Sequence, residues 1–364
     1  MNKFDLFTIG LDERFTQEAA LYGEDLYLAR ISVQYRDIYR VITGCGEIQA
    51  EVSGKFMHTA GGADNYPAVG DWVMVDRSDD AAGNAIIHHV LSRESSFVRQ
   101  AAGNGYERQV VAANIDTVFI CMSLNNDYNL RRLERYLSIA WESRAVPVIV
   151  LTKSDLCYDL DLKLCAIESV APGVDILVTS SLTGDGYDHI REYLQPGKTV
   201  AFIGSSGVGK STLINKLMGR EVLVTREIRA DDRGRHTTTH RQLLVLPGGG
   251  IVIDTPGMRE LQMAGADLSS SFADIEELAA RCRFNDCQHE SEPHCAVKQA
   301  IAEGVLSSKR LESYRKLQKE LTFAERKSTM TLEQAQKQKI IDMMGSLKAC
   351  KEFQKTNRKN KGNR

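Results

Sequence analysis

The strongest constraint on the fold of this chain is the octapeptide GSSGVGKS at residues 204–211. It matches the phosphate-loop pattern G-x-x-x-x-G-K-[ST] at every fixed position. The apolar run Val200–Ile203 precedes it, and the helical pattern Ser211–Met218 overlaps its end. Glycines let backbone N–H groups face a phosphate, and the start of a helix adds partial positive charge. The segment therefore predicts a strand, loop and helix that bind a nucleoside triphosphate.

Two side chains of this segment are expected to act on the triphosphate directly. Lys210 would reach the β- and γ-phosphates, and the Ser211 hydroxyl would coordinate Mg²⁺. A glycine-rich turn without a ligand is the alternative, but the flanking strand and helix favour the nucleotide site. The nucleotide-binding residues expected here are Gly204, Ser205, Ser206, Gly207, Val208, Gly209, Lys210, Ser211 and Thr212.

A second segment fits the same site. Residues 254–257 read D-T-P-G and follow the apolar run Ile251–Ile253. We expect Asp254 to hold Mg²⁺ through water and the Gly257 N–H to face the γ-phosphate. The tetrapeptide is also a common turn, and its place at the end of a predicted strand favours the nucleotide role.

Residues 152–155, T-K-S-D, match the guanine-specifying pattern [NT]-K-x-D after the apolar run Val146–Leu151. Asp155 would accept hydrogen bonds from guanine N1–H and the exocyclic amine, a donor pair that adenine lacks. The Lys153 stem would cover the ring face. A solvated helix N-cap is the competing interpretation of so short a match. The expected guanine-site residues are Thr152, Lys153, Asp155, Ser180 and Ser181.

The order of these segments is unusual, because the guanine segments precede the phosphate loop. Most Ras-like GTPases begin with the phosphate loop and end with the base-binding motifs, so this order indicates a circular permutation. The same sheet can still form, since the ends of parallel strands gather at one edge. The D-x-x-G segment then leads directly into the C-terminal region, and nucleotide state can be transmitted there.

Three of the eight cysteines lie close to a histidine within fourteen residues. Three thiolates and one imidazole form the donor set of a closed, structural zinc site. His294 is an alternative source of the imidazole. Free cysteines are the competing interpretation, although a segment dense in charged residues would hardly bury three thiols. The ligands expected for one structural Zn²⁺ are Cys282, Cys287, His289 and Cys295.

Composition limits the class of protein. The chain has 364 residues and a formal net charge of −2, which excludes a uniformly basic nucleic-acid binder but not a local basic patch. No apolar run approaches the ~20 residues of a membrane helix. Residues 1–10 lack the apolar stretch of a signal peptide. We therefore expect a cytoplasmic protein without a membrane partner.

The chain is predicted to contain several domains. Short runs rich in Val, Ile and Tyr alternate with glycine turns over residues 26–98, which indicates a five-stranded oligonucleotide-binding (OB) barrel, although an SH3-like barrel fits the spacing equally. Ser92–Arg108 is interpreted as a linker. The predicted domains are an N-terminal arm (1–20), an all-β OB-fold barrel (21–105), a circularly permuted α/β P-loop GTPase domain (106–265), and a mainly helical zinc-binding domain with a basic tail (266–364).

The permuted order, the phosphate loop, the segment G-R-H-T-T-T at residues 234–239 and the Cys/His cluster together resemble the ribosome small subunit-dependent GTPase A family. This family is called RsgA, YjeQ or YloQ, and the resemblance covers approximately residues 20–350. It implies a GTPase that binds GTP or GDP with Mg²⁺ and acts in late maturation of the small ribosomal subunit. The GTP state would dock on the subunit, the subunit would stimulate hydrolysis, and hydrolysis would drive release.

The resemblance also implies a switch threonine, for which Thr238 is the first candidate and Thr237 the second. Met258 stands where Ras-like enzymes carry a water-orienting glutamine, so intrinsic hydrolysis should be slow. His236 is the candidate to supply the missing group once the ribosome orders the loop, and a solvated loop histidine is the alternative. The predicted catalytic residues are His236, Lys210 and Thr238, and the predicted magnesium ligands are Ser211 and Thr238.

The expected partners are the small ribosomal subunit and its rRNA, and the chain is expected to be monomeric. Residues 348–364 carry seven Lys or Arg against one acid, which suits rRNA phosphates, although a solvated, frayed tail fits equally. Two other functions stay open: a GTP-gated rRNA-binding module in which hydrolysis is incidental, and a P-loop kinase or ATPase, against which Asp155 argues. Further basic candidates for RNA contact in the barrel are Arg30, Arg36, Arg40 and Lys55.

Overall fold

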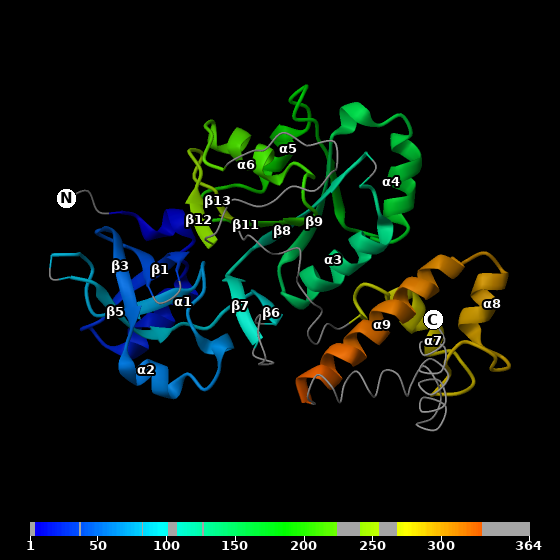
Figure 1. The fold of residues 1–364 in the computed structure, drawn as a ribbon, viewed down its shortest axis with the longest axis horizontal. Helices are drawn as coiled ribbons and strands as arrows, with labels where there is room; N and C mark the ends of the chain where they lie inside the picture. The colour runs from blue at the N-terminus through cyan, green and yellow to red at the C-terminus, as the bar shows by residue number, and fades with distance from the viewer. Residues whose placement is uncertain are drawn as a thin grey trace, which may run out of the picture.

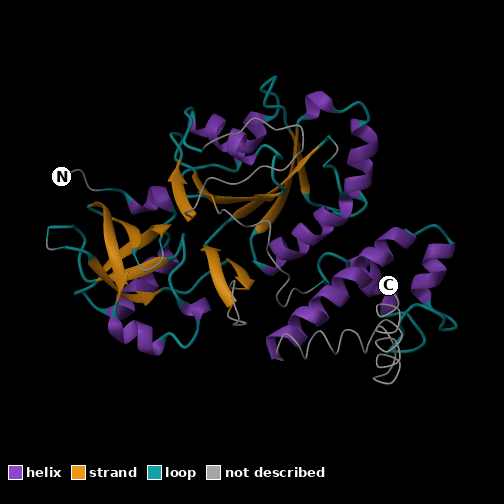
Figure 2. Ribbon diagram, viewed as in Figure 1, coloured by secondary structure: helices purple, strands orange, loops and turns teal. Residues whose placement is uncertain are grey.

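The computed structural model describes residues 4–35, 38–81, 83–100, 108–125, 127–223, 241–254 and 268–329. Three parts follow one another along the chain: a β-barrel, a central α/β part and a group of helices (Figure 1). Strands lie in the first two parts, and the third is helical (Figure 2). The fold class predicted from the sequence is therefore confirmed.

Five strands close the barrel. They pair in the order β1-β2-β3-β5-β4, and the pairing of β4 with β1 completes the ring. The β3–β5 pair is parallel, and the other pairs are antiparallel. Helix α2 (Gly54–Thr59) and the 3₁₀ turn η3 (Ala63–Asn65) connect β3 to β4. The strands are β1 (Tyr27–Gln34), β2 (Tyr39–Thr43), β3 (Gly46–Val52), β4 (Trp72–Val75) and β5 (Ala85–Val90).

The N-terminal residues pack against the barrel. They form η1 (Leu6–Ile9), α1 (Glu13–Ala19) and η2 (Ala20–Tyr22). Phe15 is buried, and its ring lies 5.7 Å from that of Trp72. This contact packs α1 against β4 of the barrel.

Arg30 of β1 is buried and links the N-terminal residues and the barrel to the central part. Its guanidinium donates to the carbonyl oxygens of Ile9, Gly70 and Asn114, and to Thr199 Oγ1 at 3.0 Å. The residue is 1 % exposed. The expectation that Arg30 contacts RNA is therefore wrong, because its donors are used inside the protein.

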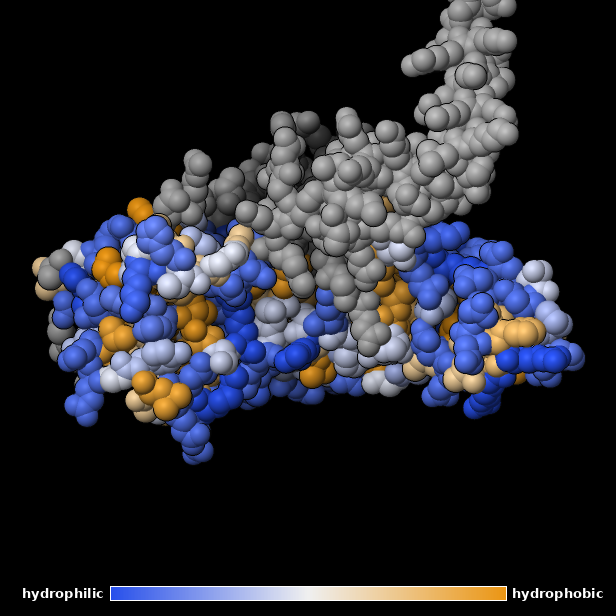
Figure 3. Space-filling model, turned by 90° about the horizontal axis from the view of Figure 1, so that it is seen from below, coloured by the Kyte–Doolittle hydropathy of each residue, from blue (hydrophilic) through white to orange (hydrophobic). Residues whose placement is uncertain are grey.

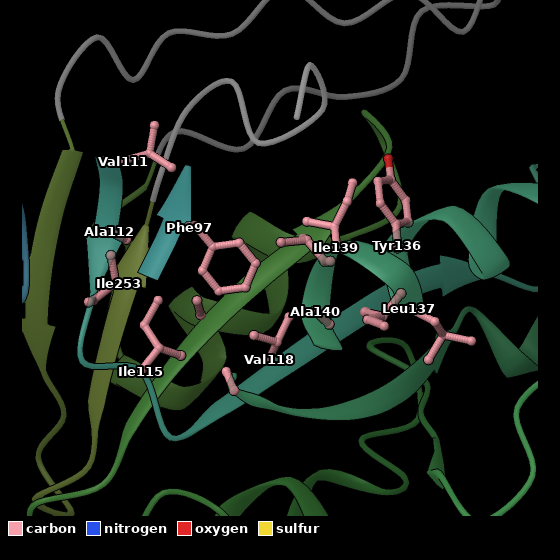
Figure 4. Packing of buried hydrophobic residues seen from close by; sticks show 14 of the residues in the cluster. Phe97, Val111, Ala112, Ile115, Val118, Tyr136, Leu137, Ile139, Ala140 and Ile253 are labelled. Atoms are coloured by element: carbon pink, nitrogen blue, oxygen red, sulfur yellow. The ribbon is translucent and has the colours of Figure 1, made fainter. Parts of the chain in front are cut away.

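Residues 92–108, expected to be a linker, contain β6 (Ser96–Gln100) and the first residue of β7 (Arg108–Ala113), which pair antiparallel. The register shifts at Phe97 and Val98, and this irregularity hides the alternation of period two in the sequence. Phe97 and Val111 pack into the core beside side chains of the central part (Figure 4). The hairpin is thus part of the folded core.

The central sheet places the strand of the phosphate loop in its middle. Its order is β10-β9-β8-β11-β13-β12, and neighbours are parallel except for β12 with β13. Every residue of β8 and β11 is buried, as expected for parallel strands covered on both faces. The strands are β8 (Thr117–Ser123), β9 (Val146–Thr152), β10 (Asp175–Val178), β11 (Thr199–Gly204), β12 (Arg241–Val245) and β13 (Ile251–Asp254). The helical elements are α3 (Leu130–Glu142), η4 (Ser154–Leu156), α4 (Leu160–Glu168), α5 (Tyr187–Glu192) and α6 (Lys210–Met218).

Strand β12 continues the central sheet into the barrel. It pairs with β13 on one side and with β1 on the other, where Val33 lies opposite Gln242 and Gln34 opposite Arg241. Residues 224–240, which include the expected switch segment, directly precede β12 in the chain. The expected switch segment is thus followed directly by β12, the strand that connects the central sheet with the barrel.

Within residues 268–329, the helices of the C-terminal part are α7 (Ala273–Ala279), α8 (Ala296–Ala302) and α9 (Ser308–Thr329). Phe272 is buried, and its ring lies 5.3 Å from that of Tyr314. On the face shown in Figure 3, apolar side chains form small groups among hydrophilic ones. Within the described residues, no helix is both long and apolar enough to cross a membrane.

Candidate nucleotide site and metal centre

The phosphate loop connects the end of β11 to the start of α6. A Cβ on Gly204, whose φ is 144°, would lie 2.3 Å from the carbonyl oxygen of Cys121, so only glycine fits there. Lys210 Nζ donates to the carbonyl oxygens of Gly204 at 2.7 Å and Ser205 at 2.6 Å. The ammonium therefore lies over the loop, within reach of a phosphate held by the loop's backbone.

The end of β9 meets this loop. Thr152 Oγ1 donates to the carbonyl oxygen of Val208 at 2.6 Å, and Lys153 Nζ donates to that of Gly207 at 2.9 Å. Lys153 has a left-handed backbone with φ of 58°, which turns the chain at the end of the strand. The structure thus brings together two segments that are about fifty residues apart in the sequence.

The next strand end orients the carboxylate expected to bind guanine. Ser180 Oγ donates to Asp155 Oδ1 at 2.5 Å, and Ser180 is 1 % exposed. Lys216 of α6 donates to the carbonyl oxygen of Ser181. The segments at 152–155 and 180–181 and the phosphate loop therefore meet at one edge of the sheet, where its parallel strands end.

Asp254 is the last residue of β13, the neighbour of β11. The pKa of Asp254 is raised above its ordinary value because the carboxyl is buried, and the positive charge of Lys210 offsets part of this rise. This carboxylate is therefore electrostatically linked to the phosphate loop. The other residues expected on this side of the site, Gly257, Met258, His236, Thr237 and Thr238, lie outside the described residues.

The four predicted metal ligands converge between α7 and α8. Their donor atoms all lie within 4.8 Å of one another. Cys282 Sγ lies 3.8 Å from Cys295 Sγ and 3.6 Å from His289 Nδ1, and His289 Nδ1 lies 3.3 Å from Cys295 Sγ. His294 is not part of this group.

These distances suit a tetrahedral ion. Zinc bonds of about 2.3 Å to sulfur and about 2.0–2.1 Å to nitrogen place neighbouring donor atoms about 3.5–3.8 Å apart. Cys295 also caps α8, since its Sγ accepts from Lys298 N at 3.5 Å. The cluster can therefore hold a metal ion that ties α8 to the end of α7.

One contact at the phosphate loop has no counterpart in the sequence motifs. Arg132 Nη1 donates to Ser205 Oγ and, at 2.6 Å, to Asp127 Oδ1. The arginine lies in the first turn of α3, far from the loop in sequence. Basic residues at the start of the helix after β8 were the available signal, but they are equally typical of a solvated helix.

Comparison with known proteins places the chain in a family. A family model described as RsgA GTPase matches residues 90–264. A second model, ABC transporter, matches residues 187–357, a range that contains the phosphate loop common to ATP- and GTP-binding proteins. Relatives that align with nearly the full length of the chain show which of the two family models applies.

Two of the relatives carry the name of this family. "Small ribosomal subunit biogenesis GTPase RsgA 2" of Lactiplantibacillus plantarum is 53% identical over 89% of this chain and 90% of its own length. The protein named "Small ribosomal subunit biogenesis GTPase RsgA" in Opitutus terrae is 42% identical over 91% of this chain and 94% of its own.

Solved structures agree with this likeness. YjeQ from Thermotoga maritima has a TM-score of 0.61 and 28% identity, covering 82% of this chain and 99% of its own. YloQ, described as a circularly permuted GTPase, has a TM-score of 0.59 and 25% identity, covering 82% of this chain and 95% of its own. The chain, whose guanine segments precede its phosphate loop, is therefore a circularly permuted GTPase and belongs to the RsgA family.

Proposed function

We propose that this GTPase acts in late maturation of the small ribosomal subunit, docking in its GTP state and leaving after hydrolysis. Relatives named small ribosomal subunit biogenesis GTPases, 42% to 53% identical over most of the chain, support the partner. The observation that carries the nucleotide part is the meeting of the guanine segment with the phosphate loop, where Lys153 Nζ lies 2.9 Å from the Gly207 carbonyl oxygen.

In this proposal, the two ends of the nucleotide are bound by different segments. Asp155, oriented by Ser180, accepts the two guanine donors, and the phosphate loop with Lys210 holds the triphosphate. Ser211, Thr238 and Asp254 would hold Mg²⁺, which neutralises charge on the β- and γ-phosphates. The chain's own contribution is to fix the nucleotide between strand ends of one sheet.

Hydrolysis by the protein alone should be slow. Met258 offers no hydrogen bond to an attacking water, so no side chain at this position orients it. His236 is the proposed substitute, and Thr238 the proposed sensor of the γ-phosphate, both placed when the subunit binds. Stimulation by the partner then follows from completion of the site.

Zinc is the proposed occupant of the Cys/His cluster. Cys282, Cys287, His289 and Cys295 supply four donors, which leaves no open position for a substrate. The ion would hold the helical part together for contact with rRNA. The basic residues 348–364 and barrel residues such as Lys55 are proposed to bind its phosphates, and the protein is proposed to act as a monomer in the cytoplasm.

Co-sedimentation with purified small subunits tests the docking cycle. We expect the full-length protein to travel with the subunit in the presence of a non-hydrolysable GTP analogue and to remain free with GDP. Equal binding in both states would contradict nucleotide-gated docking.

His236→Ala separates the enzyme from a binding module. The account predicts that this variant docks normally but loses subunit-stimulated hydrolysis. A variant with unchanged stimulation would exclude His236 from the reaction and favour the GTP-gated module.

A further inference from the structure

The first turn of α3 places a guanidinium against the phosphate loop. Arg132 Nη1 donates to Ser205 Oγ, the hydroxyl of the second residue of the loop, and at 2.6 Å to Asp127 Oδ1. Contacts of the phosphate loop with a nucleotide are made by backbone N–H groups and the lysine. The Ser205 hydroxyl is therefore available for a bond that holds the loop.

Arg132 is itself anchored. Asn129 caps α3 by accepting from the Arg132 backbone N–H at 3.1 Å, and Asp127 N donates to Asn125 Oδ1 at 3.1 Å. Asn125 Oδ1 also accepts from Ser123 Oγ, at the end of β8. The guanidinium thus has a fixed position relative to the central sheet, since both its helix and its counter-ion are tied to the strand end.

Helix α3, strand β8 and the phosphate loop enclose a small gap beside Ser205. The gap between them measures about 10 Å³ and is lined by Cys121, Leu133, Tyr136 and Ser205, among others. A single water needs roughly 10–15 Å³. The gap has room for one water at most, so Ser205 lies close against α3.

The opposite face of the same turn is bound to the helical part. Residues 132 and 134 are separated by about 200° around a helix of 3.6 residues per turn. Glu134 is 3 % exposed and accepts from Arg310 Nη1 of α9 at 3.0 Å. Arg310 also donates to both carboxylate oxygens of Asp274, at 2.6 and 2.9 Å. One helical turn therefore connects the phosphate loop with α7 and α9.

We infer that Arg132 is a positioning residue for GTP hydrolysis, which holds the phosphate loop through Ser205 and connects it, by way of α3 and Glu134, to the helical part. Loop N–H groups must meet the phosphate oxygens at hydrogen-bond distance to stabilise developing charge. A displacement of about 1 Å can cost ~100-fold in rate. Holding Ser205 therefore acts on the rate of the reaction more than on the affinity for the base.

A double-mutant cycle in the full-length protein tests the contact. We expect Arg132→Gln and Ser205→Ala each to lower kcat for GTP about 10-fold, with a smaller change in KM, and the double variant to be no slower than the slower single variant. Arg132→Lys keeps a cationic donor and should recover part of the rate. Arg131→Gln is the matched control, because Arg131 pairs with the exposed Glu312 and should leave kcat unchanged.

The inference is overturned if the two single effects multiply to about 100-fold in the double variant, since independent sites are additive in free energy. It is equally overturned if neither variant changes kcat. A purely structural role predicts a lower melting temperature for Arg132→Gln without coupling to Ser205, and the melting curve of each variant detects this. Wild-type hydrolysis in the same assay reports separately on the GTPase activity itself.

Discussion

Hydrogen bonds from single side chains hold the residues of the proposed guanine site in position without a bound base. Ser180 donates to one oxygen of the Asp155 carboxylate at 2.5 Å, and Lys153 Nζ is bonded to the phosphate-loop carbonyl of Gly207. An ionised carboxylate has about four acceptor positions, so the bond from Ser180 leaves room for two more. Because Ser180 already orients the carboxylate, the binding of guanine costs little side-chain entropy at Asp155.

Asp155→Asn should change the base preference. The amide keeps one acceptor and presents a donor where guanine also presents one, so kcat/KM for GTP should fall roughly 100-fold, given about 1.5–3 kcal/mol for each hydrogen bond to a charged group. Xanthosine triphosphate, with a carbonyl oxygen in place of the amine, should become a better substrate than GTP. Steady-state hydrolysis of both nucleotides measures this.

Asp159→Asn is the matched control for that experiment. Asp159 pairs with Lys163 at 2.8 Å on the surface, four residues beyond Asp155 in the chain. Its replacement should leave the ratio of GTP to xanthosine triphosphate turnover unchanged. An unchanged ratio in Asp155→Asn as well would place the base contact elsewhere.

At the scale of elements, a buried ion pair attaches α9 to α3. Arg310 and Glu134 are 7 % and 3 % exposed, and burial raises the pKa of Glu134, while Ser313 and Arg310 lower it. Removing one partner of such a pair leaves an uncompensated buried group. The attachment therefore depends on both members being present.

Arg310→Met should lower the free energy of unfolding by about 3–5 kcal/mol. Combining it with Glu134→Leu should restore part of the loss, because the buried carboxylate is then replaced by an apolar side chain, while Asp274 and the Ser271 carbonyl oxygen still lose Arg310. Chemical denaturation measures both variants. Arg131→Gln, which breaks an exposed pair, should cost under about 1 kcal/mol. A comparable loss in that control would contradict the importance of burial.

A carboxylate organises the loop that carries His289. Glu292 accepts from the backbone N–H groups of Gln288, Glu290 and Ser291 at 2.8–3.0 Å. Its own backbone N–H and these three bonds lower its pKa from the ordinary 4.5 to about 2. Its folded pKa is depressed, so the bonds are complete above pH 4.5 and are lost as the pH falls toward about 2. At neutral pH the Glu292 carboxylate is therefore ionised and accepts all of these hydrogen bonds.

Glu292→Ala should make the metal easier to remove. Without the carboxylate, the loop loses three hydrogen bonds, and a chelator at pH 7 should extract zinc several-fold faster than from the wild type. A colorimetric zinc assay measures the rate. Glu290→Gln, at an exposed neighbouring position, should release metal at the wild-type rate. Equal rates in all three proteins would show that Glu292 does not support the site.

At the scale of the molecule, local patterns in the sequence indicated the GTPase family and the four clustered donor residues. The phosphate loop is one continuous segment whose glycines and lysine are set by strand and helix on either side. The metal ligands also lie within fourteen residues, and the structure brings all four together. Such features are formed by residues that are close together in the sequence, so a motif in the sequence is enough to predict them.

Features that depend on distant contacts could not be predicted in this way. The Arg30 side chain contacts residues as far away as Thr199, and nothing in its own strand distinguishes it from a surface arginine. Arg132 likewise reaches Ser205 across the fold. Strands β6 and β7 lie in and beside a segment that the sequence predicts as a linker, and their pairing includes a register shift that the sequence does not display. In each case the partner is set by the tertiary arrangement.

A ribosomal partner is proposed to complete the permuted GTP site. Steady-state hydrolysis of GTP with and without purified small ribosomal subunits, with ATP as the control nucleotide, tests it most directly. The account predicts a slow basal rate for GTP that rises at least ~100-fold with the subunit, since a catalytic group supplied by a partner is worth about 10³–10⁵ in related enzymes. ATP hydrolysis should stay at background. An unstimulated GTP rate, or equal turnover of ATP, would contradict the account.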